Sequence, residues 1–368
     1  MLPAVAAFTD TYLPTVNGVS YTVQAWRDTW ADRGGRMHVV YPEAPDHVPE
    51  SREHPVRSLT FPFYEGFYAA LPQVPDGLDG LDVVHAHTPF SLGLAGRWLA
   101  GRRDLPLVAS YHTPTAEYAD YLAAGRVADV IERVAGRYEQ WYLDQADAVV
   151  VPSVPAREHL GELGVDARVE IVPNGVDTDR FAPVDDRELA AFRDRHGLPD
   201  GPLVGYTGRH GYEKNLDAIL DVAPQLDATV VFGGDGPARA RLETRAADLD
   251  ADVRFLGFLD REELPAFYSV LDVFAFPSPV ETQGLVALEA NACGTPVVGV
   301  NAGALAETVV DGKTGFHFQP NDVDAFRDGI ERALAAGETL RETCLDRRAE
   351  TSLDNAVDTL AGVYDAVL

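Results

Sequence analysis

Lysine is nearly absent from this sequence, and acidic residues are abundant. Of 368 residues only Lys214 and Lys313 are lysines, whereas Asp and Glu together number 58 and the formal net charge is −28. No basic stripe of the kind that binds nucleic-acid phosphates is visible, so we expect no nucleic-acid partner. Self-repulsion at this charge is tolerable where abundant salt screens it, and we therefore expect a high-salt cytoplasm.

Cysteine and long hydrophobic runs are also scarce. The two cysteines, Cys293 and Cys344, are too few for a disulfide framework or a zinc site, and they fit a reducing compartment. Nowhere do 18 apolar residues follow one another, and residues 1–12 lack the basic start and apolar core of a secretory signal. We therefore expect a cytoplasmic protein without a membrane-spanning helix.

Short apolar runs alternate with longer helical patterns, which is typical of βαβ units and parallel sheets. The polar stretch 177–200 separates two sets of expected strands, and an amphipathic pattern predicts a final helix. The strands are expected to begin near residues 4, 37, 82, 107, 148 and 169, and near residues 203, 229, 253, 273 and 296. We predict an α/β protein of two Rossmann-like parallel-sheet domains: residues 1–178 with the C-terminal helix 352–368, and residues 179–351.

The turn 208–215 lies between a predicted strand and a helical pattern. It begins with Gly208 and carries Arg209 and Lys214, five positions apart. The two side chains can converge on a diphosphate, the Arg as a planar fork and the Lys as a point charge. A solvated base is the alternative, but the presence of one of the chain's two lysines in this turn favours a functional role.

A second candidate anion site lies in the segment 277–290. Gly284 opens a predicted helix, whose first free N–H groups, at Gly284 and Leu285, can bind an anion. Glu289 lies about 7.5 Å further along the helix axis, which is about the reach from a phosphate to a ribose hydroxyl. Glu281 precedes the helix and would face the other end of a diphosphate-linked group. A capping acid and a surface glutamate are the alternative interpretation.

Another strand-end loop is rich in glycine. Gly234 and Gly236 are consistent with close approach of a phosphate or a base. The loop lacks the last glycine of the dinucleotide-binding fingerprint, which disfavours a nicotinamide enzyme.

Titratable residues follow the expected strands of the first half. Asp10 and His112 each lie at a strand end, and His112 suits a base, a ligand of a sugar hydroxyl or a core histidine. Of His85 and His87 on one strand, we expect one to face the ligand and the other to be core. The aromatic segment 61–68 could meet a lipid or fold back onto its domain. We see no metal-ligand cluster.

Taken together, these motifs resemble the retaining glycosyltransferases of family four over essentially the whole chain. Glu281 and Glu289 reproduce the E-x7-E spacing of that family, and Arg209 and Lys214 fall in its G-R-x-x-x-E-K-N motif. Further matches are an amino-terminal glycine loop at Asn17-Gly18-Val19 and a domain-linking motif at Asn174-Gly175-Val176-Asp177. His210 departs from the family, which often has Leu there.

The resemblance implies the GT-B fold, with two domains facing a cleft and a C-terminal helix that returns to the first domain. It implies that the second domain binds a nucleotide-sugar, with Glu289 on the ribose and Glu281 on the transferred sugar. The same resemblance places further groups on the donor: Arg209, Lys214 and the Gly284 and Leu285 amides on the diphosphate, the Gly208, Gly234 and Gly236 loops beside it, and His112 on the sugar. Asp10, Asn17 and Gly18 would line the acceptor side.

The implied reaction moves a hexose from a UDP-glucose or GDP-mannose type of donor to an acceptor hydroxyl, with retention and without a metal ion or cofactor. Within the family, the likeness is strongest to enzymes that glycosylate lipids or lipid-linked glycans, so we expect a peripheral enzyme at the inner face of the membrane. A nucleotide-sugar epimerase, a glycosidase that uses Glu281 and Glu289 as an acid and base pair, and a non-catalytic nucleotide-sugar-binding protein are the alternatives.

Overall fold

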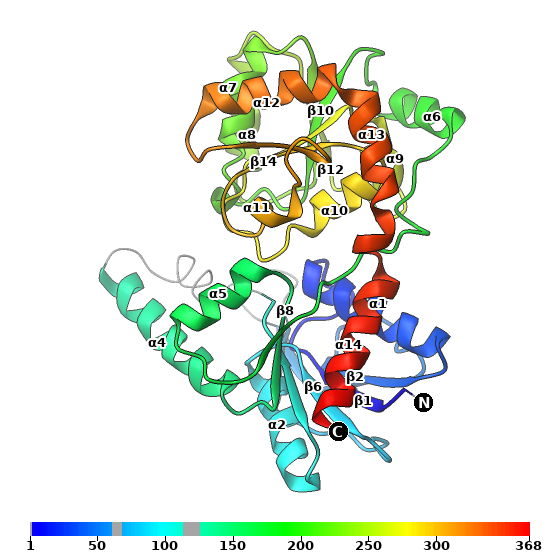
Figure 1. Ribbon diagram of the computed structural model, residues 1–368, viewed down its shortest axis with the longest axis vertical. Coiled ribbons are helices and arrows are strands. Elements are labelled where there is room, and N and C mark those ends of the chain that lie inside the picture. The colour runs from blue at the N-terminus through cyan, green and yellow to red at the C-terminus, as the bar shows by residue number, and fades with distance from the viewer. Residues whose placement is uncertain (1, 61–67, 113–125) are drawn as a thin grey trace. The chain divides into compact units, whose positions relative to one another are not determined.

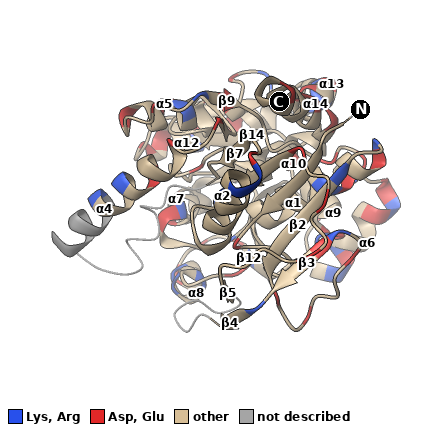
Figure 2. Ribbon diagram, turned by 90° about the horizontal axis from the view of Figure 1, so that it is seen from below, with Lys and Arg blue, Asp and Glu red and all other residues tan. Residues whose placement is uncertain are grey.

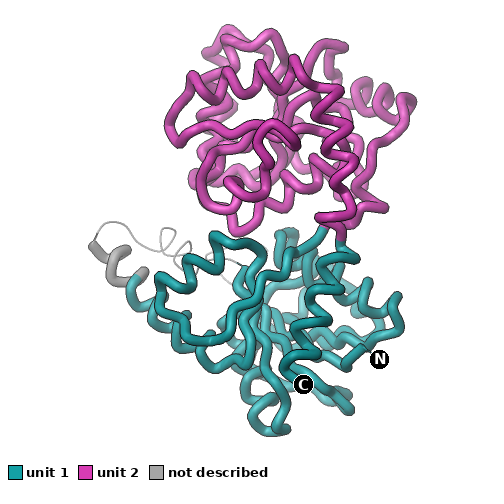
Figure 3. The backbone as a smooth tube through the Cα atoms, in the orientation of Figure 1, with its two compact units in different colours: residues 1–175, 353–368 teal, residues 176–352 magenta. Residues whose placement is uncertain are grey.

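The structure is a computed structural model that describes residues 2–60, 68–112 and 126–368. It divides into two compact units, shown in Figure 3: unit 1 comprises Met1–Gly175 and Leu353–Leu368, and unit 2 comprises Val176–Ser352. The sequence had suggested boundaries after residues 178 and 351. The prediction for the aromatic segment 61–68 lies outside the described residues, apart from Tyr68.

Unit 1 contains a seven-stranded parallel sheet (Figure 1). Its order is β3-β2-β1-β6-β7-β8-β9. The strands are β1 (Ala4–Phe8), β2 (Arg36–Pro42), β3 (Glu53–Val56), β6 (Val83–Ala86), β7 (Leu107–Ser110), β8 (Ala148–Val151) and β9 (Val169–Ile171). The short strands β4 (Ser58–Thr60) and β5 (Tyr68–Ala70) form a separate antiparallel pair. The helices are α1 (Gly18–Asp32), α2 (Ser91–Arg103), α4 (Arg126–Leu143), α5 (Val154–Glu162) and α14 (Leu353–Val367).

Unit 2 contains a six-stranded parallel sheet of order β12-β11-β10-β13-β14-β15. The strands are β10 (Leu203–Thr207), β11 (Thr229–Gly233), β12 (Val253–Gly257), β13 (Val273–Phe276), β14 (Val297–Val300) and β15 (Gly315–Phe318). The helices are α6 (Asp186–His196), α7 (Asp217–Val222), α8 (Arg239–Ala247), α9 (Leu264–Val270), α10 (Leu285–Ala292), α11 (Leu305–Thr308), α12 (Val323–Ala335) and α13 (Gly337–Asp346), with the 3₁₀ turns η2 (Tyr212–Lys214), η3 (Ala223–Gln225) and η4 (Arg348–Thr351).

The central strands are apolar on both faces because helices cover both sides of each sheet. Every residue of β1 and of β10 is buried. Unit 1 has two hydrophobic clusters that divide the alternating side chains of β1, with Ala6 and Phe8 in one cluster and Val5 and Ala7 in the other. This burial explains why the alternation of apolar runs and helical patterns in the sequence predicts the fold class, which is confirmed.

The C-terminal helix packs on unit 1, as predicted. Figure 1 shows α14, in red, beside α1. Its residues Val357, Leu360 and Tyr364 are fully buried, and the Tyr364 ring lies 5.4 Å from the Trp30 ring of α1 in an edge-on arrangement. The apolar residues that recur at helical spacing in the sequence therefore form the face that α14 buries. Within the described residues, no helix has both the length and the apolar character needed to span a membrane.

Candidate functional site

Three loops of unit 2 follow neighbouring strands and so emerge at one edge of the sheet. They follow β10, β11 and β13, which are adjacent in the order β11-β10-β13. In open parallel sheets, ligands bind beyond the carboxyl ends of the strands. The predicted donor-side residues of the second domain lie on these three loops and on helix α10, which follows β13.

A direct ion pair connects two of these loops. The Lys214 Nζ atom, in η2 after β10, lies 2.8 Å from the Glu281 Oε1 atom, in the loop after β13. The two residues are 67 positions apart in sequence, and their side chains are 19% and 15% exposed. The structure thus brings together two of the predicted site residues, of which Lys214 was predicted to bind a phosphate and Glu281 the transferred sugar.

Arg209 has an acid partner as well. Its Nη1 atom lies 3.4 Å from the Glu213 Oε1 atom, within the same turn. Both cations of the turn 208–215 are therefore balanced by carboxylates of the protein. A bound anion with a higher charge than a carboxylate could exchange with these partners, because the cation side chains are long and only partly buried.

The glycines of the neighbouring loop have a packing reason for their presence. A Cβ atom on Gly234 would stand 2.0 Å from the Gly208 carbonyl oxygen, and one on Gly236 would stand 2.7 Å from the His210 carbonyl oxygen. Both glycines also have positive φ angles, 99° and 156°. They therefore allow the loops after β10 and β11 to pack against each other. The sequence alone had suggested only the close approach of a ligand as the reason for these glycines.

Helix α10 begins at Leu285, and Gly284 is its N-cap with a φ of 76°. As a glycine, this N-cap residue has no side chain with which to cap the helix. Its first amides and the positive end of its dipole therefore suit an anion. A Cβ atom on Gly284 would stand 2.7 Å from the Leu305 Cδ2 atom, so a larger residue would require the Leu305 side chain to move and would be strained at this φ.

Glu289 lies further along α10 and is only 6% exposed. Its Oε2 atom accepts a hydrogen bond of 2.8 Å from the Tyr268 hydroxyl. Burial raises the pKa of Glu289 to about 7, while the Tyr268 hydrogen bond and the charges of Arg261 and Arg180 oppose this rise. No sequence motif indicates the partner Tyr268, which lies on α9. The ribose contact of Glu289 stays a prediction.

In unit 1, the Asp10 carboxylate is held by the start of α2. It accepts hydrogen bonds of 2.6 Å from the Thr88 and Ser91 hydroxyls and one of 3.0 Å from the Leu92 amide. The N-cap residue of α2, Phe90, provides no such bond from its side chain. Asp10 therefore caps α2 from a distant part of the sequence, a role that the motif alone did not reveal. Its place on the acceptor side stays a prediction.

Asn17 and Gly18 form the beginning of α1. The Asn17 side chain accepts a hydrogen bond of 2.8 Å from the Ser20 amide and donates one of 2.7 Å to the Thr11 hydroxyl. Gly18 is exposed, and a Cβ atom there would have no neighbour within 4 Å. The fold thus explains Asn17 as a cap, while no packing contact explains the glycine at position 18.

Three histidine rings stack at the carboxyl ends of β6 and β7. The His85 and His87 ring centroids are 4.0 Å apart, and those of His87 and His112 are 5.4 Å apart. The prediction that only one of His85 and His87 would be core is wrong, since both are buried. Residues i and i+2 of a strand lie on the same face, so the two rings share a side of the sheet.

Burial lowers the pKa values of all three histidines. The pKa of His85 falls to about 3 and that of His112 to about 4, and the pKa of His87 lies well below its usual range. The three rings are therefore neutral at pH 7. Tyr364 of α14, whose hydroxyl lies 2.6 Å from His85 Nδ1, is a member of this cluster that sequence reasoning missed.

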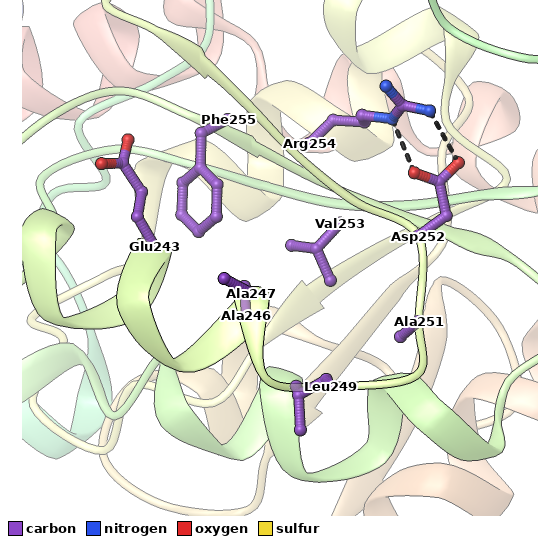
Figure 4. A pocket seen from close by; sticks show the side chains of 9 residues that line it. All are labelled: Glu243, Ala246, Ala247, Leu249, Ala251, Asp252, Val253, Arg254 and Phe255. Carbon is purple, nitrogen blue, oxygen red and sulfur yellow. Dashed lines mark hydrogen bonds and ion pairs between the residues drawn. The ribbon is translucent and has the colours of Figure 1, made fainter.

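One surface hollow lies away from these residues, beside the edge strand β12 of unit 2. Figure 4 shows its lining, which includes Ala246, Val253 and Phe255 and an ion pair in which Arg254 Nε lies 2.6 Å from Asp252 Oδ1. None of the predicted site residues lines it. In the described part of the chain, no three His, Cys, Asp or Glu side chains are placed to hold a metal ion.

Two family models match the chain, and together they cover most of it. The model described as Glycosyltransferase Family 4 matches residues 16–180, and the model described as Glycosyl transferases group 1 matches residues 190–347.

Among curated proteins, a GDP-mannose-dependent alpha-mannosyltransferase of Mycolicibacterium smegmatis is 31% identical, over 99% of this chain and 97% of the relative. The alpha-monoglucosyldiacylglycerol synthase of Streptococcus pneumoniae is 28% identical, over 95% and 83%. Among solved structures, the sucrose-phosphate synthase of Thermosynechococcus elongatus has a similar fold, with a TM-score of 0.79 at 22% identity over 99% of this chain and 98% of that chain.

Proposed function

This chain belongs to glycosyltransferase family 4 and has the GT-B fold, and we propose that it is a retaining hexosyltransferase. Its donor would be a nucleoside-diphosphate sugar of the UDP-glucose or GDP-mannose type. Its acceptor would be a hydroxyl group on a membrane lipid or a lipid-linked glycan. The reaction would need neither a metal ion nor a cofactor.

The observation that supports this proposal best is the ion pair between Lys214 and Glu281. A donor diphosphate carries more negative charge than Glu281 and would attract Lys214, with Arg209 and the first amides of α10 nearby on the same sheet edge. Glu281 would then accept hydrogen bonds from the sugar hydroxyls. This contact within unit 2 supports the proposal that Lys214 binds a phosphate and Glu281 the sugar of one nucleotide-sugar, because their side chains lie next to each other.

Bond breaking in this reaction places negative charge on the departing diphosphate. The bond between the anomeric carbon and the diphosphate oxygen breaks, and the acceptor oxygen forms the new bond on the same face of the sugar. The acceptor proton passes to the departing phosphate oxygen. Fixed cations and helix amides at this position, here Arg209, Lys214 and the start of α10, stabilise the developing charge.

A lipid acceptor and peripheral membrane contact are supported by one surface of unit 1. Helix α2 contains three arginines and no acidic residue, although the chain carries a net charge of −28. Phe90, Leu94 and Trp98 follow at intervals of four and are all exposed, while the Arg97 guanidinium lies 5.4 Å from the exposed Trp141 ring of α4. Arginines interleaved with exposed aromatic side chains suit the interface of an anionic membrane. Figure 2 shows the blue basic segments on α2 and α4.

The same proposal places the enzyme at the inner face of the cell membrane, in a cytoplasm of high salt concentration. The support is the excess of 58 acidic over 30 basic residues. Salt at molar concentration reduces the Debye length to about 3 Å and so removes most of the repulsion between these charges.

Calorimetric titration with UDP, GDP, ADP and their hexose conjugates, in molar KCl without added metal, tests the donor site. One diphosphate should bind tightly, and Lys214→Ala should weaken it about 30-fold, equivalent to about 2 kcal/mol for a lost charge-assisted contact. The matched control is Lys313→Ala, which removes the other lysine, an exposed one before β15, and should change nothing.

The titrations and turnover assays also separate the alternatives. A folded sample that binds none of these nucleotides, or that loses affinity equally in both lysine variants, would contradict the proposed donor site. Conversion of the donor sugar without an acceptor would indicate an epimerase, hydrolysis of a glycoside without a nucleotide donor would indicate a glycosidase, and binding without turnover would indicate a non-catalytic protein.

A further inference from the structure

The histidine cluster of unit 1 contains a hydrogen bond between two imidazole rings. The His87 Nδ1 atom lies 3.0 Å from the His112 Nε2 atom, and the ring planes differ by only 12°. A contact of this length between two ring nitrogens holds one proton, which one nitrogen donates and the other accepts. The position of that proton decides what the remaining nitrogen of His112 can do.

The environment of His87 distinguishes the two arrangements. Its Nε2 atom is buried and has no hydrogen-bond partner in the part of the chain that the structure describes. Each neutral ring carries one proton. If His112 donated to His87, the His87 proton would have to be on Nε2, as a buried N–H group without an acceptor. If His87 donates instead, its Nε2 atom carries only a lone pair.

The second arrangement is the more stable one. Buried N–H groups without an acceptor are rarer in proteins than buried acceptors with an unused lone pair, because an orphaned donor loses its hydrogen bond outright. Trp26 adds to the apolar surroundings, since its ring centroid lies 5.9 Å from that of His87. The His87 proton therefore lies on Nδ1, between the two rings.

We propose that His87 is a positioning residue that fixes His112 as the Nδ1–H tautomer. His112 then carries its proton on Nδ1, and neither ring nitrogen has a lone pair with which to act as a base. The tautomer assignment does not depend on the proposed function, whereas its role in catalysis rests on that function. It agrees with a reaction in which the departing phosphate takes the acceptor proton.

His85 supports the arrangement from the other side of His87. It stacks on His87, and its Nδ1 and Nε2 atoms lie 2.6 Å from the Tyr364 hydroxyl and 2.8 Å from the Ser110 hydroxyl. A hydroxyl can donate or accept, so either tautomer of His85 is satisfied. His85 thus holds the His87 ring in place, but it does not determine which nitrogen of His87 carries the proton.

Nitrogen NMR of the histidine side chains in the full-length enzyme tests the proposal without any assay of activity. We expect ¹⁵N-histidine spectra at pH 7.5 to show a protonated Nδ1 atom on both His87 and His112, with assignments made from His→Gln variants at each position. A protonated Nε2 atom on His112, or a mixture of tautomers, would overturn the proposal. Because the ligand-free enzyme is measured, this outcome is independent of whether the chain transfers a sugar.

Two variants separate positioning from general support of the fold. In His87→Phe the ring stack is retained but the proton donor is lost, so His112 should show mixed tautomers and kcat should fall about tenfold, with donor KM within about twofold. Tyr364→Phe perturbs the same stack one ring further away and should keep the His112 tautomer. An unchanged His112 spectrum in His87→Phe, or an equal change in Tyr364→Phe, would contradict the positioning role.

Discussion

At the strand ends of unit 1 the side chains of Asp10, His85 and His87 are buried and hydrogen-bonded within the fold, whereas at those of unit 2 Lys214 and Glu281 form an ion pair nearer the surface. Asp10 is 4% exposed and bound by the start of α2, and His85 and His87 are buried and neutral. Lys214 and Glu281 form an ion pair and are 19% and 15% exposed.

This difference indicates that the two units suit different kinds of ligand contact. A buried, internally satisfied group has few ways to exchange partners, and it therefore suits fixed hydrogen bonding to hydroxyls. A partly exposed ion pair can exchange one partner for a bound anion at little cost, because solvent and the anion replace what is lost. Unit 2 is accordingly the half that suits a diphosphate.

Removal of the Glu281 charge should produce the largest change. We expect Glu281→Gln to lower kcat by about a thousandfold, since under the proposed function Glu281 contacts the reacting sugar and such a group contributes mainly to the transition state. Diphosphate affinity should stay the same or increase, because Lys214 loses a competing carboxylate. Steady-state kinetics and calorimetry on the same sample give both quantities.

The control for this variant is Glu243→Gln. Glu243 is a surface carboxylate of the same unit, paired with Arg239 at 2.8 Å on α8, and its neutralisation should leave kcat unchanged. Unchanged turnover in Glu281→Gln would remove Glu281 from the reaction and leave unit 2 as a nucleotide-binding domain only.

Glu289 is the exception in unit 2, since it is as buried as the titratable groups of unit 1. The pH dependence of the free energy of unfolding should reveal this. Its pKa is raised from 4.5 to about 7 in the folded chain. Between these values the folded chain holds a proton that the unfolded chain has released, so stability falls as pH rises through this window, by about 3 kcal/mol in total.

Urea unfolding between pH 4 and pH 8 at constant KCl measures this effect. Glu289→Gln cannot ionise and should lose this part of the pH dependence, so it gains stability relative to the wild type as pH rises. Tyr268→Phe removes the hydrogen bond that holds the pKa down and should extend the decline to higher pH. Parallel pH profiles of the wild type and Glu289→Gln would show that folding does not raise the pKa of Glu289.

The sequence predicts the central strands of both parallel sheets and two of their four edge strands, β9 and β12. Strands such as β10 are buried on both faces and therefore appear as uninterrupted apolar runs. The edge strands β3 and β15 were not expected, because β3 is a four-residue segment that contains Pro55 and β15 is short and begins with Gly315. An edge strand pairs with only one other strand and needs fewer apolar residues than a central strand. Its hydrophobic pattern in the sequence is therefore weak.

For the site, motif spacing identifies residues but not their partners. The turn that contains Lys214 and the segment that contains Glu281 each stand out in the sequence, yet their contact across 67 residues depends on the order of β10 and β13 in the sheet. The partners Tyr268 and Tyr364 carry no motif at all. They belong to helix faces whose apolar spacing is explained by packing alone.

The smallest expected effect concerns the beginning of α1 in unit 1. Gly18 and Gly337 are both the first residue of a helix, α1 in unit 1 and α13 in unit 2, and a Cβ atom at either would meet nothing within 4 Å. Alanine at either position should therefore be accommodated, and it should raise the free energy of unfolding by about 0.5 kcal/mol through the unfolded chain.

The two alanine variants should nevertheless differ in activity. If Gly18 lines the acceptor side, Gly18→Ala should raise the acceptor KM several-fold and leave the donor affinity unchanged, whereas Gly337→Ala should alter neither. Stability and acceptor kinetics measured on both variants decide the matter. Equal kinetics would mean that the glycine at position 18 is no part of the acceptor site, and the search for acceptor contacts in unit 1 would move to His112.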